Sequence, residues 1–387
     1  MNSLKIMLLA IALLFCHNAV ALPQWNPTLF PVLQNGKWGF IDASGQMKIA
    51  PNYQSASYFS EGLAAVSVNV QTGFWADGRP SIHPQYGFID ESGKMVIAPK
   101  YRLAMSFREG VAWVEDNRGP SGFIDHAGKI VVTPPNGTYC REFRDGLALA
   151  QPLLPSGAEL VAPVPPGFTR RAEEPRKVGF IDKTGGYAIA PKFDYAWNFA
   201  EGLAAVTLDG KKWGFVDKTG AFAIAPQFDR AFYFSEGFAA VESGGKMIFI
   251  GKDGKNAFAG QYDEAQPFNS GLAAVRIGDK WGFINQTGAL VIAPQWEEVA
   301  TFFGDRAGVK INGKWGFIDK SGALIVAPNY DYAHFFLGEL ASVTFNSTMS
   351  DGAAGYINRA GKVVWEPAPK ADPKPVSQRG PFKTQSP

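Results

Sequence analysis

The chain has 387 residues, of which 46% are hydrophobic, so it is long enough to bury a large core. Its 37 basic and 35 acidic side chains leave a net charge of +2, and acids and bases are interspersed along the chain. This balance excludes the strongly basic surface that nucleic-acid and anionic-lipid binders need, so no nucleic-acid partner is expected.

Residues 1–21 have the pattern of a cleavable export signal. Lys5 supplies a positive charge, residues 6–16 form an apolar run, and residues 19–21 give a small-x-small cleavage site. The apolar run is too short to span a bilayer comfortably, and no later stretch approaches the roughly 18 apolar residues of a transmembrane helix. We therefore expect cleavage near Ala21, no transmembrane segment, and a mature protein in the periplasm or outside the cell.

Cysteine usage adds little to this picture. Cys16 leaves with the signal, so Cys140 remains alone and no intramolecular disulfide is possible. A lone thiol can pair with another chain, but a small buried side chain is the favoured interpretation.

Most of the mature chain is a repeat. A short phrase returns nine times at a period of roughly 34 residues, most clearly as Lys37–Asp42 and Lys314–Asp319. The phrase predicts one strand, and an apolar run such as Leu203–Leu208 predicts the strand before it. The turn between them is a dipeptide such as Asn35-Gly36, which accepts the positive φ angles of a tight hairpin.

A second turn and a third strand complete each unit. The turn has the pattern Asp-x-x-Gly, as in Asp42–Gly45, in which the Asp side chain caps a turn amide and Gly takes the left-handed position. The third strand is an apolar run such as Ala223–Ala225. We expect it to end at Pro226, or at Pro99 in the second unit, because proline removes a ladder donor. Each unit is therefore predicted to be a three-stranded antiparallel meander.

The side-chain pattern predicts how the meanders meet. Trp38 and Phe40 point to one face of the second strand, while Gly39 and Ile41 point to the other. Both faces are apolar and should be covered, and Gly at its place should let a neighbouring sheet approach closely. A single meander cannot bury enough surface to be stable. The sequence thus predicts an all-β tandem array of about nine three-stranded antiparallel meanders stacked face to face.

Two arrangements stack sheets in this way: an open or superhelical solenoid, and a β-propeller-like ring. Propellers usually have roughly 4–8 blades of four strands, whereas the sequence indicates nine units of three strands, with a complete unit at each end. The open array is therefore favoured. A linker of about ten residues between units, such as Tyr195–Gly202, is left as a turn, a helical turn or a short fourth strand. A fourth strand would favour the ring.

The repeated phrase resembles the WG-repeat family, which is named for its Trp-Gly pair. The resemblance covers roughly residues 29–366, and it implies a β-rich array of the exported bacterial type with no general enzymatic activity and no catalytic motif. Its structural residues include Trp38, Gly39, Phe40, Trp213, Gly214, Trp281, Gly282, Trp315 and Gly316. The departures are Tyr86, Ser121, Val178, Met247 and Ala354 in place of Trp, and Ile248 in place of Gly.

Three segments leave the pattern. The repeat domain spans residues 22–366 and carries insertions near 69–85 and 151–177, and a Pro-rich tail at 367–387 is expected to be disordered. Insertions in repeat proteins tend to emerge on one face, often the binding face. A solvated loop remains the favoured interpretation of each insertion.

The linkers hold a pair of variable positions between a constant Ala and a constant Phe. Aromatic side chains there can stack on sugar rings or grip an extended peptide. Packing between repeats is the alternative, and it is favoured. With one aromatic residue from the first insertion, the candidate binding residues are Tyr58, Trp75, Trp197, Tyr233, Phe302 and His334.

The sequence gives little support for an enzyme. His83, His126 and His334 are too scattered to suggest a local metal site, and no nucleophile elbow, phosphate loop or zinc motif is present. Each turn aspartate offers one carboxylate where calcium needs several ligands. No catalytic residue, metal or cofactor is therefore predicted.

These observations favour a non-enzymatic, exported β-repeat protein that presents an extended surface to a protein or glycan partner. Two alternatives stay open: a structural spacer of the cell envelope, and a glycan-cleaving enzyme whose paired carboxylates meet across repeats. The identity of the partner and the oligomeric state are left open by the sequence.

Overall fold

A computed structural model describes residues 27–74, 79–116, 119, 121–152, 177–345 and 354–367. These residues form strands and turns. They contain no helix, and therefore no helix that could cross a membrane. The proposed signal, Trp75, most of the second insertion and the Pro-rich tail lie outside the described residues.

The strands form antiparallel sheets in chain order. The first sheet contains β1 (Leu29–Gln34), β2 (Lys37–Asp42) and β3 (Met47–Tyr53). The second contains β4 (Ser55–Ala56), β5 (Leu63–Phe74), β6 (Pro80–Asp90), β7 (Met95–Ala104), β8 (Ala112–Asp116), β9 (Gly122–Ile124) and β10 (Ile130–Val132). The third contains β11 (Thr138–Arg144), β12 (Leu147–Pro152), β13 (Val178–Ile181) and β14 (Tyr187–Phe193).

The remaining sheets continue the series. The next two contain β15 (Tyr195–Ala196), β16 (Ala204–Thr207), β17 (Trp213–Val216) and β18 (Phe222–Phe228), then β19 (Arg230–Ala231), β20 (Ala239–Ser243) and β21 (Lys246–Ile250). The sixth and seventh contain β22 (Glu264–Ala265), β23 (Leu272–Ile277), β24 (Lys280–Asn285) and β25 (Leu290–Trp296), then β26 (Glu298–Val299), β27 (Arg306–Ile311), β28 (Lys314–Asp319) and β29 (Leu324–Tyr330). The last contains β30 (Tyr332–Leu337), β31 (Leu340–Thr344), β32 (Gly355–Asn358) and β33 (Val363–Trp365).

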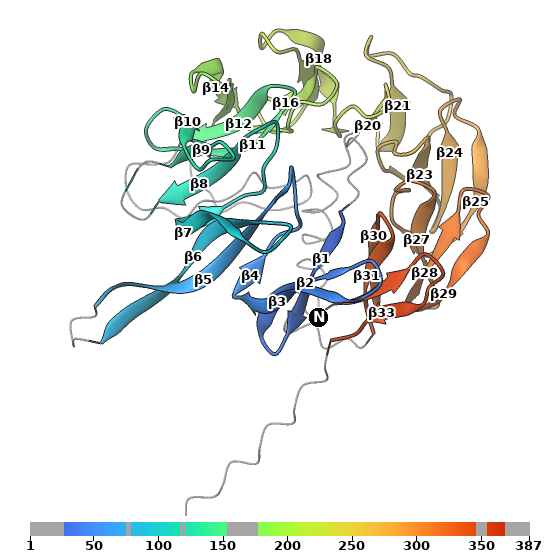
Figure 1. Ribbon diagram of the computed structural model, residues 1–387. Coiled ribbons are helices and arrows are strands. Elements are labelled where there is room, and N and C mark those ends of the chain that lie inside the picture. The colour runs from blue at the N-terminus through green and yellow to red at the C-terminus, as the bar shows by residue number, and fades with distance from the viewer. Residues whose placement is uncertain are drawn as a thin grey trace, which may run out of the picture.

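Each linker holds a short fourth strand, which settles the question that the sequence left open. In the fifth unit, β15 pairs with β16 through Tyr195 and Ala196. The fourth strand lies on the inner side of the array, while third strands such as β25 and β29 lie on the outside (Figure 1). We call each meander with its short inner strand a blade, numbered 1 to 9 along the chain; blades 2 and 3 share the seven-stranded sheet.

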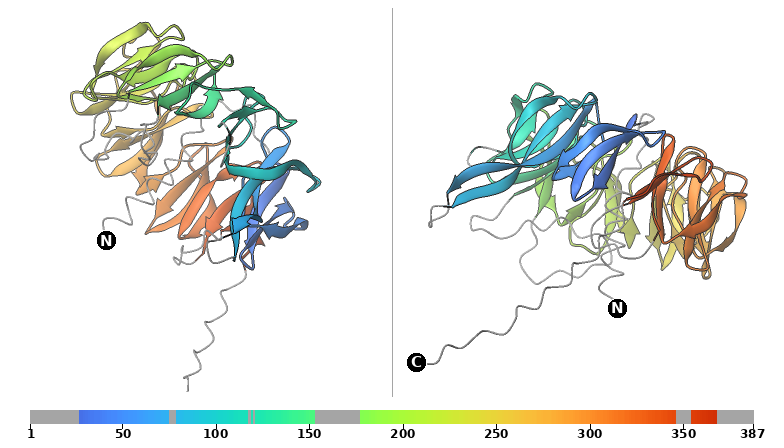
Figure 2. Two further views of the ribbon diagram at one scale, coloured as in Figure 1. Left: turned by 90° about the vertical axis from the view of Figure 1, so that its left-hand side faces the viewer. Right: turned by 60° about the horizontal axis from the view of Figure 1, so that its bottom comes forward.

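The blades close into a ring. Phe30 and Ile41 of blade 1 share a core cluster with Leu340 and Tyr356 of blade 9. The first and last blades lie side by side in every view (Figures 1 and 2). The prediction of stacked meanders is confirmed, and of the two arrangements the structure adopts the ring rather than the open array. The short inner strand favours the ring, because it gives seven of the nine blades, as the structure describes them, the four strands that a propeller blade uses.

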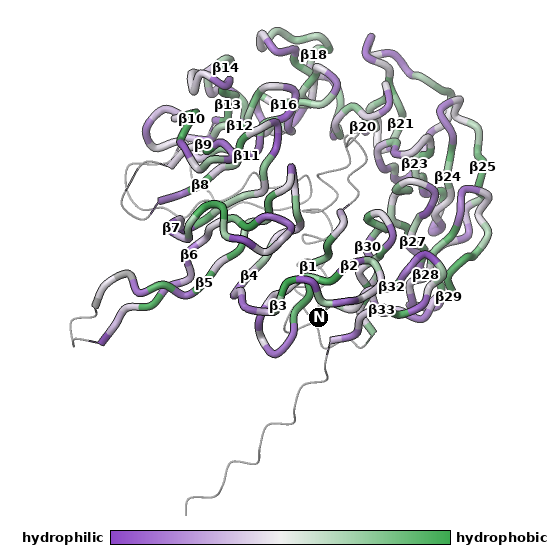
Figure 3. The backbone as a smooth tube through the Cα atoms, in the orientation of Figure 1, coloured by the Kyte–Doolittle hydropathy of each residue, from purple (hydrophilic) through white to green (hydrophobic). Residues whose placement is uncertain are grey.

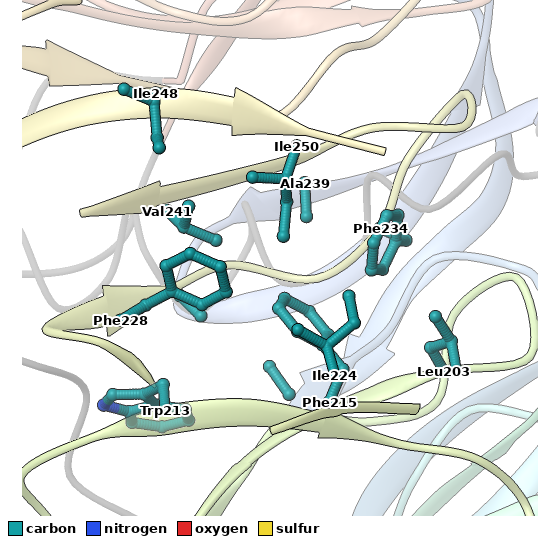
Figure 4. Packing of buried hydrophobic residues seen from close by; sticks show 12 residues of the cluster. Leu203, Trp213, Phe215, Ile224, Phe228, Phe234, Ala239, Val241, Ile248 and Ile250 are labelled. Atoms are coloured by element: carbon teal, nitrogen blue, oxygen red, sulfur yellow. The ribbon is translucent and has the colours of Figure 1, made fainter. Parts of the chain in front are cut away.

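The predicted division of side chains between the two faces is confirmed. Apolar strands alternate with polar turns along the described residues (Figure 3). Phe215 of blade 5 packs with Val241 of blade 6, whereas Val216 packs with Leu149 of blade 4. The close view of the interface between blades 5 and 6 shows Trp213 and Phe215 directed toward the next sheet (Figure 4). Each blade is therefore stabilised by both neighbours.

The prediction that proline ends the third strand is wrong. β18 and β7 run through Pro226 and Pro99. In blade 5, Phe215 pairs with Ile224 and Trp213 pairs with Phe228, so β18 uses two more residues than β17 over this step. The extra residues form a bulge at the outer edge, where a missing amide costs nothing in the ladder.

The bulge explains the glycine of the Trp-Gly pair. A Cβ atom on Gly214 would lie 2.6 Å from the Ile224 carbonyl oxygen and 2.7 Å from the Pro226 nitrogen. The close approach therefore comes from the third strand of the same sheet and not, as expected, from a neighbouring sheet. In blade 6, Ile248 replaces this glycine, and the sheet has only three described strands, with none in the place of β18.

The first insertion is a strand extension. β5 and β6 continue as a two-stranded ribbon through the pairs Asn69↔Pro84, Val70↔His83 and Gln71↔Ile82. The ribbon projects away from the ring (Figures 1 and 2). We call its described residues, 68–74 and 79–85, the arm.

Candidate functional site: the inner edge of the ring

The variable positions of the linkers lie on the inner edge. After a short inner strand such as β15 or β19 come two residues, which we call the inner-edge pair, and then a phenylalanine; in blades 4 and 9 the same three positions lie within β11 and β30. The amide of the first residue of the pair is held by the next strand: Trp197 N donates to Ala205 O at 2.9 Å, and Phe232 N donates to Ala240 O at 2.9 Å. The backbone thus fixes a constant frame on which the side chains vary.

The phenylalanine after each pair belongs to the core. Phe302 is fully buried, and its ring packs 4.9 Å from that of Phe283. It therefore occupies the constant position, and the inner-edge pair of blade 8 is Ala300-Thr301; placing Phe302 in the variable pair was an error of one residue. Similar contacts at 4.7–5.0 Å join Phe40 to Phe59, Phe88 to Phe107, Phe123 to Phe143, Phe180 to Phe199, Phe215 to Phe234, Phe249 to Phe268 and Phe317 to Phe336.

Two of the predicted binding residues lie together in blades 5 and 6. Trp197 is half-buried, and its Nε1 donates to Ala231 O at 3.0 Å. Its ring lies 6.2 Å from Tyr233 and 6.3 Å from Phe232, measured between centroids. The Arg230 guanidinium lies 5.7 Å from the centre of the Phe232 ring. We call Trp197, Phe232 and Tyr233 the inner aromatic cluster, although Tyr233 is largely buried.

A second aromatic group lies on blades 8 and 9. The rings of Phe303 and Phe335 stack at 4.9 Å with an interplanar angle of 26°. His334, which is half-buried, lies 4.8 Å from the Tyr332 ring. Burial lowers the pKa of His334 to about 4, so the imidazole is neutral at pH 7. The imidazole is therefore suited to aromatic and hydrogen-bonding contacts and not to charge pairing.

Tyr58 serves the junction between blades 9 and 1. Its hydroxyl lies 3.0 Å from the Tyr356 hydroxyl, which donates to Pro31 O at 3.0 Å. Burial raises the pKa of Tyr58 and of Tyr356, so both stay protonated. Blade 1 has no inner strand among the described residues, and Tyr356 packs 5.6 Å from Phe30 in place of the usual Phe–Phe contact. Tyr58 thus belongs to the closing contact of the ring.

The inner edge is charged in blade 4. Glu142 is half of the inner-edge pair there, and Arg144 Nη2 lies 3.1 Å from its Oε1. Burial raises the pKa of Glu142, but Arg144 and Arg108 outweigh this effect and hold the pKa below its usual value. Glu142 is therefore ionised and paired with arginine. The inner edge offers aromatic side chains in one sector and charged side chains in another.

A second regular feature lies in the turns that lead into the first strands. Glu201 has a positive φ of 54°, which is uncommon for any residue other than glycine. Its carboxylate accepts the Gly237 amide of the next blade at 3.1 Å, and Lys252 donates to its carbonyl oxygen at 2.9 Å. We call the series of such bonds the acid ladder: Gly110 to Glu61, Gly146 to Glu109, Gly202 to Asp145, Gly237 to Glu201, Gly271 to Glu236 and Gly304 to the Ser270 hydroxyl.

The acid ladder was not predicted from the sequence, although the sequence contains a signal for it. An acid-Gly dipeptide recurs before the first strand, as in Glu201-Gly202 and Glu236-Gly237. His126 has the same role as Lys252, since its Nε2 lies 3.4 Å from Glu61 Oε2 and its ring stacks 4.2 Å from Phe107. These carboxylates are occupied by amides and cations of the next blades, so the ladder holds blades together.

The turn aspartates cap their own turns, as predicted. Asp42 Oδ1 accepts the Ser44 amide at 2.9 Å, the Ser44 hydroxyl at 2.6 Å and the Gln46 amide at 3.0 Å. The hydrogen bond from the Ser44 side chain is the main reason that the pKa of Asp42 is lowered to about 2. In the part of the chain that the structure describes, no three His, Cys, Asp or Glu side chains are grouped to hold a metal. Cys140 is buried, as favoured, and burial raises the pKa of its thiol to about 12.

The family described as WG containing repeat matches residues 38–69, 86–118, 122–151, 179–211, 213–246, 249–281, 281–315 and 315–348. No curated protein matches the sequence significantly.

Solved structures give low similarity. BamB from Moraxella catarrhalis has a TM-score of 0.38 and 9% identity, over 79% of this chain and 91% of that one. KlHsv2 with loop 6CD replaced by a Gly-Ser linker has a TM-score of 0.32 and 11% identity, over 76% and 92%. At these values the similarity carries no argument about function.

Proposed function

Because the chain belongs to the family of WG containing repeat proteins, we propose that it is a non-enzymatic repeat protein that binds a protein or glycan partner with its ring. The observation that carries the proposal is the inner aromatic cluster. Trp197 and Phe232 are only half-buried although their neighbours Phe199 and Phe234 are fully packed. Flat rings of this kind offer faces to sugar rings or to an extended peptide.

The same proposal places the protein in the cell envelope or outside the cell. It rests on the charged, apolar and small-residue pattern of residues 1–21. The even balance of charges along the repeats fits a partner recognised by stacking and hydrogen bonds more than by charge.

A binding experiment tests the proposal with a variant that the fold itself suggests. Gln266 occupies the position of Trp197 and Phe232 in blade 7, so the double variant Trp197→Gln, Phe232→Gln should fold. Pull-downs with envelope fractions and with purified polysaccharides are expected to retain the native protein and to lose the double variant by about tenfold or more.

The matched control is Phe222→Gln. Phe222 is 38% exposed but lies on the outer strand β18, so its removal should leave binding unchanged. A native protein that is retained by neither material would remove the main support for the proposal. Equal loss in the control would show that the inner aromatic cluster is not the surface involved.

A further inference from the structure

The arm has an open edge on β5. β4 covers β5 only at Val66 and Ser67. Ser67 O accepts the Gln54 amide at 2.8 Å, so Ser67 directs its backbone groups away from β6, and every second residue along β5 must do the same. Asn69 and Gln71 therefore direct their amides and carbonyls to this edge. Within the described ranges no strand pairs with them there.

Other blades cap the matching amide with an acid. Gly244 and Gly278 occupy the place of Asn69 in blades 6 and 7, and their amides donate to Asp229 Oδ2 at 3.2 Å and Asp263 Oδ2 at 2.7 Å. Blade 2 has Gln54 where these acids stand. The described contacts include no bond from Gln54 to Asn69, so within them the Asn69 N–H has no acceptor.

From Val68 to Gln71 nothing on β5 blocks the addition of a strand; the register of β5 against β6 shifts only after Gln71, before Gly73. Soluble proteins usually guard open edges with proline, charge or bulges. Pro84 guards the free edge of β6 opposite Asn69, whereas β5 contains neither proline nor a charged side chain. The outer strands of the ring are guarded by Pro51, Pro99, Pro191, Pro226, Pro294 and Pro328.

We infer that this edge pairs with the same edge of a second copy of the chain. The pairing is antiparallel about a twofold axis at Val70, so that Asn69 faces Gln71 of the second copy and Val70 faces its own counterpart. This register satisfies the outward donors and acceptors of Asn69 and Gln71 in both copies at once. Asn69 and Gln71 are exposed and uncharged, so no repulsion opposes it. The arm projects away from the ring (Figures 1 and 2), so the edges of two arms can meet without contact between the rings.

Charge exchange at Val70 tests the register. Val70→Lys and Val70→Glu each place like charges directly opposite one another in the paired arms, where they repel. Sedimentation of the mature chain from about 1 μM to about 1 mM is expected to show a concentration-dependent dimer for the native protein. Each variant alone should be monomeric, and an equimolar mixture of the two should dimerise again. A native chain that stays monomeric throughout would overturn the inference.

Two proline variants test which edge is used. Asn69→Pro removes an amide on the open edge of β5, and Ile82→Pro removes one on the free edge of β6; neither amide takes part in the bonds between β5 and β6. Asn69→Pro should abolish the dimer and Ile82→Pro should keep it. A dimer that survives Asn69→Pro, or one that both variants abolish, would contradict pairing through β5. The binding function proposed for the inner edge does not depend on either result.

Discussion

Gly214 shows how a single residue position is decided by the backbone of its own sheet. The second strand needs an apolar face on each side, yet at this position the bulged third strand crosses directly above. The tryptophan before it, Trp213, has room on the opposite face and packs against the next blade. In the Trp-Gly pair, the tryptophan thus packs against the next blade, and the glycine leaves space for the bulge of the third strand.

Replacement of this glycine should be costly. In Gly214→Ala the new methyl group would overlap the Ile224 carbonyl, and the bulge would have to shift, at a cost of about 1–3 kcal/mol. Gly73→Ala is the control, because a Cβ there meets nothing within 4 Å and Gly73 has no positive φ. The midpoint of thermal unfolding should fall for Gly214→Ala and stay within error for Gly73→Ala. Equal effects would contradict the role given to the bulge.

The turns are held by regular sets of side-chain hydrogen bonds. Each Asp-x-x-Gly turn is held by one side-chain oxygen of its aspartate. In blade 7 an asparagine takes this place, and Asn285 Oδ1 accepts the Thr287 amide at 3.0 Å. In each acid ladder turn, the bond to the next blade offsets the conformational cost of the positive φ angle. Turn chemistry therefore serves both the hairpin and the interface.

Acid should weaken the capped turns. The pKa of Asp42 is about 2, below the value near 3.9 of an unfolded chain. The stability that ionised Asp42 gives to the folded state is therefore full above about pH 4 and is lost as the pH falls from about 4 to about 2. The contribution of one exposed turn is small because solvent screens it. Four further turn aspartates have lowered pKa values for the same reason, a hydrogen bond from the side chain two residues on: Asp90, Asp182, Asp217 and Asp319.

The measurement is the melting temperature between pH 2 and pH 7. A variant with all five aspartates changed to Asn keeps the acceptor oxygen, as Asn285 does, and should lose less stability than the native protein between pH 4 and pH 2. Parallel curves for the two proteins would show that the turn caps are not the groups that titrate.

The acid ladder gives a prediction about side-chain replacement. Glu236 accepts the Gly271 amide at 2.9 Å and has a φ of 54°. Glu236→Ala keeps the strained backbone but loses this bond, at about 1 kcal/mol, together with the exposed bond from Gln286 Nε2 at 2.8 Å. Glu236→Ser should restore the bond to the Gly271 amide, because Ser270 serves the same purpose in blade 7. Denaturant midpoints should rank native, Ser and Ala in descending order. A Ser variant no better than Ala would argue against the bond.

The ring as a complete assembly of blades depends on one unusual interface. Eight interfaces use a Phe–Phe contact, but between blades 9 and 1 Tyr356 bonds to Tyr58 and to Pro31 O. Phe30 and Val32 would be left without cover if this interface opened. The closing contact therefore decides between ring and open array.

Removal of one hydroxyl should weaken the closure. Tyr356→Phe leaves Pro31 O and the Tyr58 hydroxyl without their buried partner, which costs about 1–3 kcal/mol. Tyr53→Phe is the control, since the Tyr53 hydroxyl makes no hydrogen bond within the described ranges and its ring is similarly buried. Hydrogen exchange of β1 and β32 should accelerate in Tyr356→Phe alone. Unchanged exchange there would mean that the two hydroxyl contacts do not hold the ring shut.

Much of the candidate site was within reach of the sequence, and part of it was not. The linker position and Trp197 followed from variable residues on a constant frame. Phe302 was misplaced because its linker offers two adjacent phenylalanines, Phe302 and Phe303, and only burial distinguishes them. Trp75 lies outside the described residues, and the binding role of the others stays a prediction.

The all-β repeat, the hairpin and capped turns, and the face on which each side chain lies could all be predicted from the residues alone. These depend on residues a few positions apart, as in the bond from the Gln46 amide to the Asp42 side chain, four positions apart. Tertiary structure alone decided the ring, the bulge above Gly214 and the acid ladder. The ring closes through a bond between residues 325 positions apart, Tyr356 and Pro31, and no local pattern specifies a contact at that separation.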